Sequence, residues 1–322
     1  MNVDLVAGVE SGRRSRGGFW HEAQFYAGSE DFIRKTSTFV REGLDLGEPV
    51  LVLVVPAKIE LLRDELGSES ARVRFGDMAE IGRNPGRIIS RWRDFVSEHA
   101  ASGGRVRGIG EPIWPGRSIE ELVEAQRHES LVNLALAGAP AWVLCPYDLD
   151  ALDPTVIDDA FRSHPIVSDG SFGSSSTTYQ RLETIERPFD APLNEVPATA
   201  EVLDLSVETL SVLRSRVGAR AAEGGIDASR ARDFVLAVNE VASNSLLHGA
   251  GRVTVTMWTE NGHFVSEVRD QGVIREPLAG RRRPAIGDRS GYGLWIANEL
   301  CDLVQLRSFR DGSAVRLRVR RS

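Results

Sequence analysis

The spacing of hydrophobic residues predicts alternating strands and helices over the first part of the chain. Val50–Val55 is an unbroken apolar run, which is typical of a strand covered on both faces within a parallel sheet. The spacing of the next group of hydrophobic residues instead predicts one face of an amphipathic helix: Phe32, Phe39, Val40 and Leu44. Further strands are expected near Phe19 and at 73–75, 106–109 and 141–145, with helices at 59–66, 87–100 and 119–137. This alternation predicts an α/β domain with a mostly parallel sheet.

The pattern changes after a segment rich in glycine, serine, threonine and proline. We therefore predict a first domain over residues 19–185, a linker over 186–198 and a second domain over 199–322. In the second domain, strands are expected at 201–205, 252–259, 264–270, 303–308 and 313–320, and helices at 207–223, 228–248 and 292–301. Helices followed by paired strands predict an α+β fold with an antiparallel or mixed sheet.

The last predicted strand alternates strictly between apolar and charged side chains. Val315, Leu317 and Val319 are expected on a buried face of the sheet. The arginines at 316, 318 and 320 are expected on the opposite face, in contact with water.

Composition narrows the classes of protein. With 42% hydrophobic and 26% charged residues, the chain is expected to be folded and soluble, and its apolar runs are too short for a membrane span. The first residues lack a secretory signal pattern and there are only two cysteines, which favours a reducing, cytoplasmic compartment. The net charge is −7, and residues 199–322 carry 18 arginines against 15 acidic residues. That balance is too weakly basic for a dedicated nucleic-acid binder.

A helix in the second domain carries a polar pair beside its apolar stripe. Within "FVLAVNEVASNSLLHG", Glu240 and Asn244 are four residues apart and therefore share one helix face. Their oxygens suit a hard cation such as Mg²⁺. Taken alone, such a pair is more typical of a solvated helix face.

Two further segments add candidate ligand contacts. A strand ends in Asp270, Gln271 and Gly272, where a carboxylate can accept from an amine and glycine allows close approach of a flat group. Gly291 and Gly293 precede an apolar helix, whose free amides favour phosphate. Each segment alone is a weak signal, and no Walker-type or Rossmann-type glycine motif with the required context occurs.

In this order, the segments "NEVASNSLLHG", "DQG" and "RSGYGL" resemble the N, G1 and G2 boxes of the GHKL (Bergerat) ATP-binding fold, and most closely the RsbW-type anti-sigma-factor serine/threonine kinases. The resemblance covers residues 199–322. It implies ATP and Mg²⁺ as cofactors, with Asn244 as metal ligand, Glu240 as catalytic base and Asp270 on the adenine amine. Nucleotide contacts are implied for Gly272 and for Arg289, Ser290, Gly291, Tyr292, Gly293 and Leu294.

The same resemblance implies partners and a lid. A sigma factor and an anti-anti-sigma (STAS-type) protein would be the partners, with a serine or threonine of the latter as phosphate acceptor. Residues 273–290 would be the lid, in which the arginines at 281–283 close on phosphates, meet an acidic partner or form a solvated basic loop. Dimers are common among such kinases, which leaves a homodimer open, and a module that holds ATP without transferring phosphate is the alternative.

The first domain resembles the MEDS sensory domain over residues 19–185, through "HEAQFY", "REGLDLGEPVLVLVVP", "GRNPGRIISRWRDF" and "GEPIWPGRSIEELVEAQRHESLVN". This resemblance implies a small-molecule ligand and a degenerate P-loop-like fold, because "PAKIELLRDEL" after the strand lacks glycines that cradle phosphate. Six aromatic residues either line a ligand pocket or pack in the core: Phe25, Tyr26, Trp92, Trp114, Trp142 and Tyr147.

Histidines offer weaker candidates. His21, His128 and Glu111 are secondary site candidates in the first domain, and the remaining histidines show no paired metal-ligand spacing. "RHESLVN" loosely resembles the phosphoacceptor helix of a histidine kinase, with His128 as acceptor. Its helix is expected within the first domain and far from the ATP-binding segments, which disfavours that reading.

Overall fold

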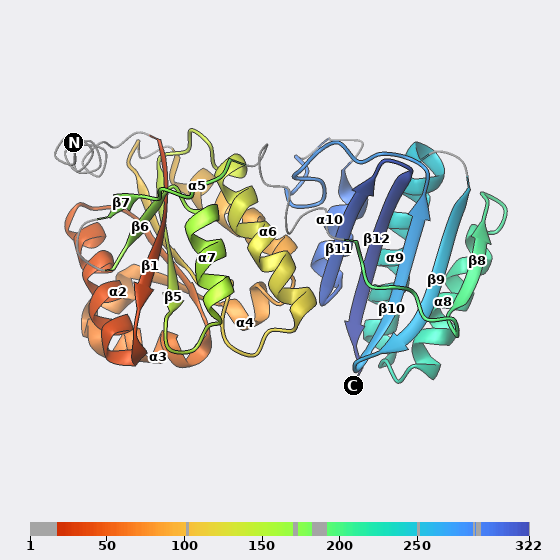
Figure 1. Cartoon of the computed structure of the whole chain (residues 1–322), viewed down its shortest axis with the longest axis horizontal. Helices are drawn as coiled ribbons and strands as arrows, with labels where there is room; N and C mark the ends of the chain where they lie inside the picture. The colour runs from red at the N-terminus through yellow and green to blue at the C-terminus, as the bar shows by residue number, and fades with distance from the viewer. Residues whose placement is uncertain are drawn as a thin grey trace. The chain divides into compact units, whose positions relative to one another are not determined.

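The computed structural model describes residues 18–100, 103–169, 173–181, 192–249, 252–285, 287 and 291–321. The chain divides into two compact units, residues 1–185 and 186–322 (Figure 1). The assignment of residues 186–198 to a linker stays a prediction. None of the described helices combines the length and the apolar character that a bilayer span requires.

The described part of the first unit is built on a seven-stranded sheet of order β3-β2-β4-β5-β1-β6-β7. Strands β1 to β6 pair in parallel, and β7 runs antiparallel to β6. Their bounds are β1 (Phe19–Tyr26), β2 (Val50–Val54), β3 (Val73–Asp77), β4 (Val106–Gly110), β5 (Ala141–Asp148), β6 (Ile166–Ser168) and β7 (Ser174–Ser175). The predicted parallel sheet is confirmed.

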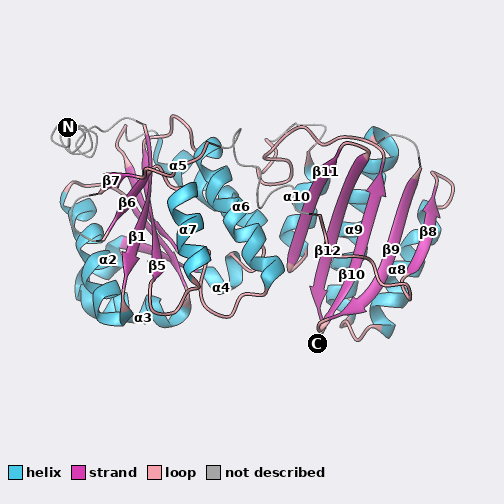
Figure 2. Ribbon diagram, in the orientation of Figure 1, coloured by secondary structure: helices cyan, strands magenta, loops and turns pink. Residues whose placement is uncertain are grey.

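Helices cover both faces of this sheet (Figure 2). On one face lie α2 (Gly28–Asp45) and α3 (Pro56–Leu66), and on the other lie α4 (Met78–Ile81), α5 (Ile88–His99), α6 (Ile119–Ala135) and α7 (Pro154–Ser163). The apolar run of β2 serves both layers, because alternate residues point to opposite faces. Leu51 and Leu53 pack in one core, whereas Val50, Val52 and Val54 pack in the other.

Local signals explain where several helices begin. Ser118 and Glu121 form a reciprocal capping box at the start of α6. The Asp153 side chain caps α7, and Pro154 occupies the first position of that helix. Helix α7 and strand β6 were absent from the sequence prediction, although "DLDALDPTVIDDAFRS" carries this start signal.

The second unit contains a five-stranded antiparallel sheet of order β11-β12-β10-β9-β8 within its described residues. The strands are β8 (Glu201–Leu205), β9 (Val253–Glu260), β10 (His263–Asp270), β11 (Leu303–Phe309) and β12 (Gly312–Arg320). Helices α8 (Leu210–Glu223), α9 (Ala228–His248) and α10 (Tyr292–Leu300) share one hydrophobic core with the sheet (Figure 2). This is a two-layer α+β sandwich, as the order of helices and paired strands predicts.

The two faces of β12 differ from the prediction in one respect. Val315, Leu317 and Val319 are buried in the core as expected. The prediction of a wet opposite face is wrong for Arg316 and Arg318, which are 1% and 3% exposed. Arg316 is covered because it pairs with buried Glu267, lies over the Trp258 ring at 5.0 Å and donates to the Asn194 carbonyl oxygen. The backbone at Asn194 therefore covers this face of the sheet and takes the place of water as the hydrogen-bond partner of Arg316.

Candidate functional site

A cavity of about 360 Å³ opens in the second unit where α9 ends, β10 ends and α10 begins. Five of the residues predicted from the three motifs line it: Asn244, Asp270, Gly272, Gly291 and Leu294. Apolar side chains of Val241, Ile274 and Val315 form other parts of its wall. The fold therefore gathers three segments that are far apart in the sequence around one partly apolar hollow, which suits a flat base.

The remaining predicted residues lie elsewhere. Glu240 is one helical turn before Asn244 on α9 but is not among the lining residues. Tyr292 and Gly293 form the first turn of α10 and are not among the lining residues, and the Tyr292 hydroxyl donates to the Ala285 carbonyl oxygen at 3.0 Å. Arg289 and Ser290 lie outside the described residues, so their predicted nucleotide contacts stay predictions.

Gly293 is needed for the approach of α10 to α9. A Cβ placed on Gly293 would overlap the side-chain amide nitrogen of Asn244 and would lie 3.2 Å from its Cγ and 3.4 Å from the Glu240 carbonyl oxygen. The two contacts with Asn244 are too short, since carbon atoms prefer roughly 3.5–4.0 Å, whereas the contact with the Glu240 oxygen is ordinary. The second glycine of the motif therefore lets the two helices meet at Asn244.

Gly291 has a different role, at the start of α10. Its φ is +93°, a left-handed conformation that favours glycine, and it occupies the N-cap position. No side chain caps this helix start among the described residues. The first amides of α10 thus begin beside a cavity that Gly291 itself lines, as a phosphate-binding helix start would require.

The Asp270 carboxylate is held by its own turn. One of its oxygens, Oδ1, accepts a 2.6 Å hydrogen bond from the Gly272 backbone amide. A Cβ on Gly249, at the end of α9, would lie 2.8 Å from Asp270 Cγ, so that glycine also leaves room for the carboxylate. Asp270 and His248 are the titratable side chains among the described lining residues, which leaves Asp270 as the acidic acceptor.

Several lining residues were not predicted from the sequence. His248 and Gly249 are the last two residues of the quoted helix motif, so the motif itself carried their signal. Ser313 and Val315 come from β12, which is sequentially remote and pairs with β10 in the sheet. Only strand pairing could reveal that contribution.

The segment expected as a lid is partly fastened in its described residues. The Asn298 side chain donates to the Gly280 carbonyl oxygen at 2.9 Å, and Leu278 is buried. Arg281 is buried as well, whereas Arg283 lies over the Trp295 ring at 5.7 Å. Within residues 273–285, the contacts therefore place Arg281 and Arg283 against the protein.

The first unit shows no glycine loop after β2, because α3 begins at Pro56 directly. Lys58 in that helix donates to the Tyr26 hydroxyl at 2.6 Å and pairs with Glu111. Burial raises the pKa of Glu111, while Lys58 acts in the opposite direction. A P-loop-like ancestry of this domain stays a prediction.

Core packing accounts for most of the aromatic candidates. Trp114 packs against the core as a partly buried residue. The other five are buried: Phe25, Tyr26, Trp92, Trp142 and Tyr147. His128 lies in α6 of the first unit and is 2% exposed. A phosphoacceptor must reach a kinase's nucleotide, so this burial argues against His128 as an acceptor.

Comparison with known families agrees with the two-unit structure. Residues 20–165 match the family model described as the MEthanogen/methylotroph, DcmR Sensory domain (MEDS), and residues 203–319 match the histidine kinase-like ATPase domain. The N-terminal part of the chain thus matches a MEDS sensory domain, and the C-terminal part matches a histidine kinase-like ATPase domain, which is GHKL-like. No curated protein gives a significant sequence match.

Solved structures add only distant likenesses. One is the structure of the RsbU and RsbW domains of a Mycobacterium tuberculosis protein, with 20% identity, a TM-score of 0.30, and coverage of 38% of this chain and 33% of that chain. Another is the histidine kinase AdeS of Acinetobacter baumannii, with 10% identity, a TM-score of 0.22, and coverage of 39% of this chain and 68% of that one. The first match thus spans a third of the other chain, and neither likeness is close enough to support an argument.

Proposed function

We propose that the chain is a sensory anti-sigma-factor serine/threonine protein kinase. Its second domain would bind ATP with Mg²⁺ and phosphorylate an anti-anti-sigma (STAS-type) protein, and its MEDS domain would regulate that activity. The observation that carries this proposal is the shared cavity: Asn244, Asp270, Gly272 and Gly291 line one hollow in an ATPase-type domain.

The lining residues suit the parts of a nucleotide. Asp270 Oδ1 accepts from the Gly272 amide, so Oδ2 can accept from the exocyclic amine of a base. Val241, Ile274 and Val315 offer apolar contact to a base, and the start of α10 offers backbone amides to phosphate. The Asn244 side-chain oxygen is the expected protein ligand for Mg²⁺.

Glu240 would orient and deprotonate the acceptor hydroxyl. ATP with Mg²⁺ supplies an activated phosphoryl group whose transfer depends mainly on positioning and charge neutralisation. Glu240 stands one turn from Asn244 on the same rigid helix, so a nucleotide held at Asn244 would bring the reacting group near it.

A second function shares the nucleotide but omits the chemistry. In this alternative, the ATP-bound domain sequesters a sigma factor without transferring phosphate. The position of Glu240 outside the lining residues favours it, because a base must reach the reacting group. The sigma factor remains a partner in both proposals, and a homodimer and a cytoplasmic location remain expectations in both.

Radiolabelled ATP separates these functions. The full chain, incubated with Mg²⁺, labelled ATP and a STAS-type protein, is expected to label a serine or threonine of that protein. Glu240→Gln should abolish transfer and largely spare ATP binding, since it removes the base without touching the lining. Asp233→Asn is the control, because it removes an exposed carboxylate of the same helix two turns before the half-buried Glu240, about 10 Å along the axis.

The outcomes are distinct. Binding of ATP and of a sigma factor without any transfer would support sequestration, and transfer that persists in Glu240→Gln would remove that residue as base. Absence of ATP binding in the wild-type chain would overturn both functions.

A further inference from the structure

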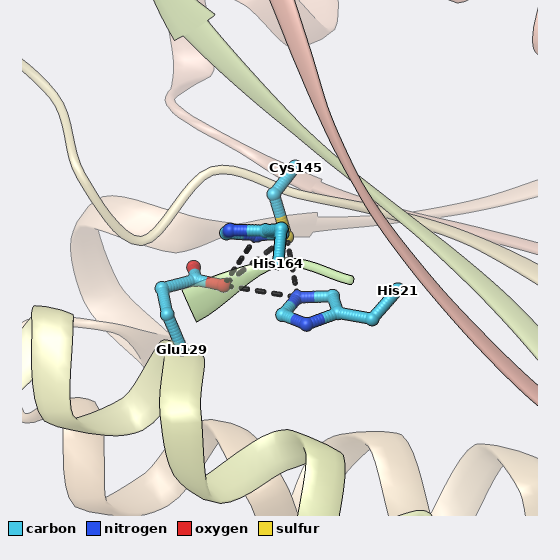
Figure 3. Close-up of side chains that lie close together, drawn as sticks. All are labelled: His21, Glu129, Cys145 and His164. Atoms are coloured by element: carbon cyan, nitrogen blue, oxygen red, sulfur yellow. Dashed lines mark hydrogen bonds and ion pairs between the residues drawn. The ribbon is translucent and has the colours of Figure 1, made fainter. Parts of the chain in front are cut away.

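Four side chains with metal-binding atoms meet in the interior of the first unit. His21 comes from β1, Glu129 from α6, Cys145 from β5, and His164 directly follows α7 (Figure 3). Their exposures are 1%, 1%, 3% and 0%. His21 and Cys145 lie on the same sheet face, because β1 and β5 pair in parallel with Ala23 beside Cys145.

The four functional atoms are close to one another. Glu129 Oε2 is 3.0 Å from His21 Nε2, 3.1 Å from His164 Nε2 and 3.4 Å from Cys145 Sγ. His21 Nε2 is 3.3 Å from Cys145 Sγ, and all four atoms lie within 4.8 Å of one another. Figure 3 shows the imidazoles, the carboxylate and the thiol pointing toward one centre.

The hydrogen bonds of His164 determine which of its nitrogens carries the proton. Its Nδ1 lies 2.9 Å from the Ala160 carbonyl oxygen, which can only accept, so the proton belongs on Nδ1. The nearby Ser163 hydroxyl donates to the Asp159 carbonyl oxygen at 2.9 Å and need not supply that proton. With the proton on Nδ1, Nε2 offers a lone pair, and this atom lies 3.1 Å from Glu129 Oε2.

His21 is oriented in the same way by Asn133. The Asn133 amide nitrogen donates to the Ser163 carbonyl oxygen at 2.9 Å, which fixes its Oδ1 as the atom that accepts from His21 Nδ1 at 3.1 Å. The His21 proton therefore also belongs on Nδ1. Its Nε2 lone pair faces the Glu129 carboxylate.

Two Nε2 atoms, a carboxylate oxygen and a sulfur atom, all electron-pair donors, thus lie close together. Among these four atoms, only the Cys145 sulfur carries a hydrogen. The two imidazole centroids are 4.0 Å apart, which disfavours charge on both rings together. Lone pairs of Nε2 and carboxylate at 3.0 Å repel each other unless a cation lies between them.

We propose that His21, Glu129, Cys145 and His164 form a four-coordinate site for a divalent transition metal ion, with zinc as the best-suited ion. Two imidazoles, a thiolate and a carboxylate match the ligand preferences of zinc and of Co²⁺. Zinc–ligand bonds of about 2.0–2.3 Å in a tetrahedron put ligand atoms about 3.3–3.6 Å apart. Four of the six separations between ligand atoms are 3.0–3.4 Å and need only a small expansion, and the other two pairs lie within 4.8 Å.

The outer contacts and the charge also fit an ion. Each imidazole donates its other N–H to an oxygen, the arrangement that orients metal-binding histidines. Thiolate and carboxylate charges neutralise a divalent ion in this dry interior. On binding, the Cys145 S–H bond breaks, an S–metal bond forms and the proton leaves to solvent.

Cobalt titration of the full chain is the direct test. After removal of metal with a chelator, the reduced chain is titrated with Co²⁺ and followed by visible and near-ultraviolet absorption. We expect one ion per chain, the intense visible bands of tetrahedral Co²⁺, and a sulfur-to-cobalt charge-transfer band. Zinc should displace the cobalt and remove these bands.

The two cysteines provide a matched pair of variants. Cys301→Ser changes the other buried cysteine, in the second unit, and should keep the full spectrum. Cys145→Ser should lose the sulfur band and weaken binding by more than the roughly 10–100-fold that follows loss of an outer hydrogen-bond partner. His164→Gln should weaken binding similarly.

The cobalt titration tests the proposed site even if Cys145→Ser fails to fold. Because the chain has only two cysteines, a sulfur-to-cobalt band in Cys301→Ser can come only from Cys145. Absence of that band in both the wild-type chain and Cys301→Ser, or wild-type binding by a folded Cys145→Ser variant, would overturn the site.

Discussion

Replacing Gly293 with alanine perturbs the contact between α10 and Asn244 without removing any predicted ligand contact. The new methyl would overlap the Asn244 amide nitrogen and would lie 3.2 Å from its Cγ. The strain is relieved most easily at the free end of the Asn244 side chain, because the other close atom is the Glu240 carbonyl oxygen of the helix backbone. We therefore expect Asn244 to turn away from its native position.

The expected magnitudes differ for stability and for binding. Alanine gains about 0.5–1 kcal/mol over glycine within a helix, which offsets much of the roughly 1–3 kcal/mol cost of overpacking. The free energy of unfolding should therefore fall by no more than about 2.5 kcal/mol. Loss of a contact to a charged group costs about 2 kcal/mol, which corresponds to roughly 30-fold weaker Mg²⁺-dependent ATP binding.

Calorimetric titration with ATP, with and without Mg²⁺, and urea unfolding together measure both effects. Gly218→Ala in α8 is the matched control, because its methyl would lie 3.7 Å from Val235 Cγ2, an ordinary contact. That variant should be slightly stabilised and should bind ATP as the wild type does. Wild-type ATP affinity in a folded Gly293→Ala chain would refute the reasoning that this glycine positions Asn244.

Two further predictions concern buried polar groups. Glu267→Gln should destabilise the second unit by about 3 kcal/mol in urea unfolding, because it leaves the buried Arg316 guanidinium without its counter-charge; an unchanged unfolding midpoint would contradict this. His128→Gln should leave any phosphorylation by labelled ATP intact, and acid-labile label that disappears in this variant would instead identify a histidine kinase.

Much of the fold followed from local pattern. The unbroken apolar run of β2 required cover on both faces, and the structure provides it with α2 and α3 on one side and α4 to α7 on the other. The apolar stripe of α9 likewise predicted its packing on the sheet. Such patterns are readable because burial repeats with the period of each element. Helix α7 was not predicted, because the start signal of Asp153 and Pro154 was not used.

The candidate nucleotide site was partly readable for a different reason. Asn244, Asp270 and Gly291 stand in short motifs whose order resembles a known family, and the fold brings them to one cavity. The contribution of Ser313 depended on the pairing of β12 with β10, which no local spacing records.

By itself, the sequence determined the order of strands and helices, the division into an α/β and an α+β part, and the motifs of the second domain. Tertiary structure alone decided that Arg316 is buried rather than wet, because a remote backbone segment and Glu267 cover it. It also brought His21, Glu129, Cys145 and His164 together from four elements that share no motif spacing. Contacts between remote elements depend on sheet order and helix packing, and the period of one element carries no information about either.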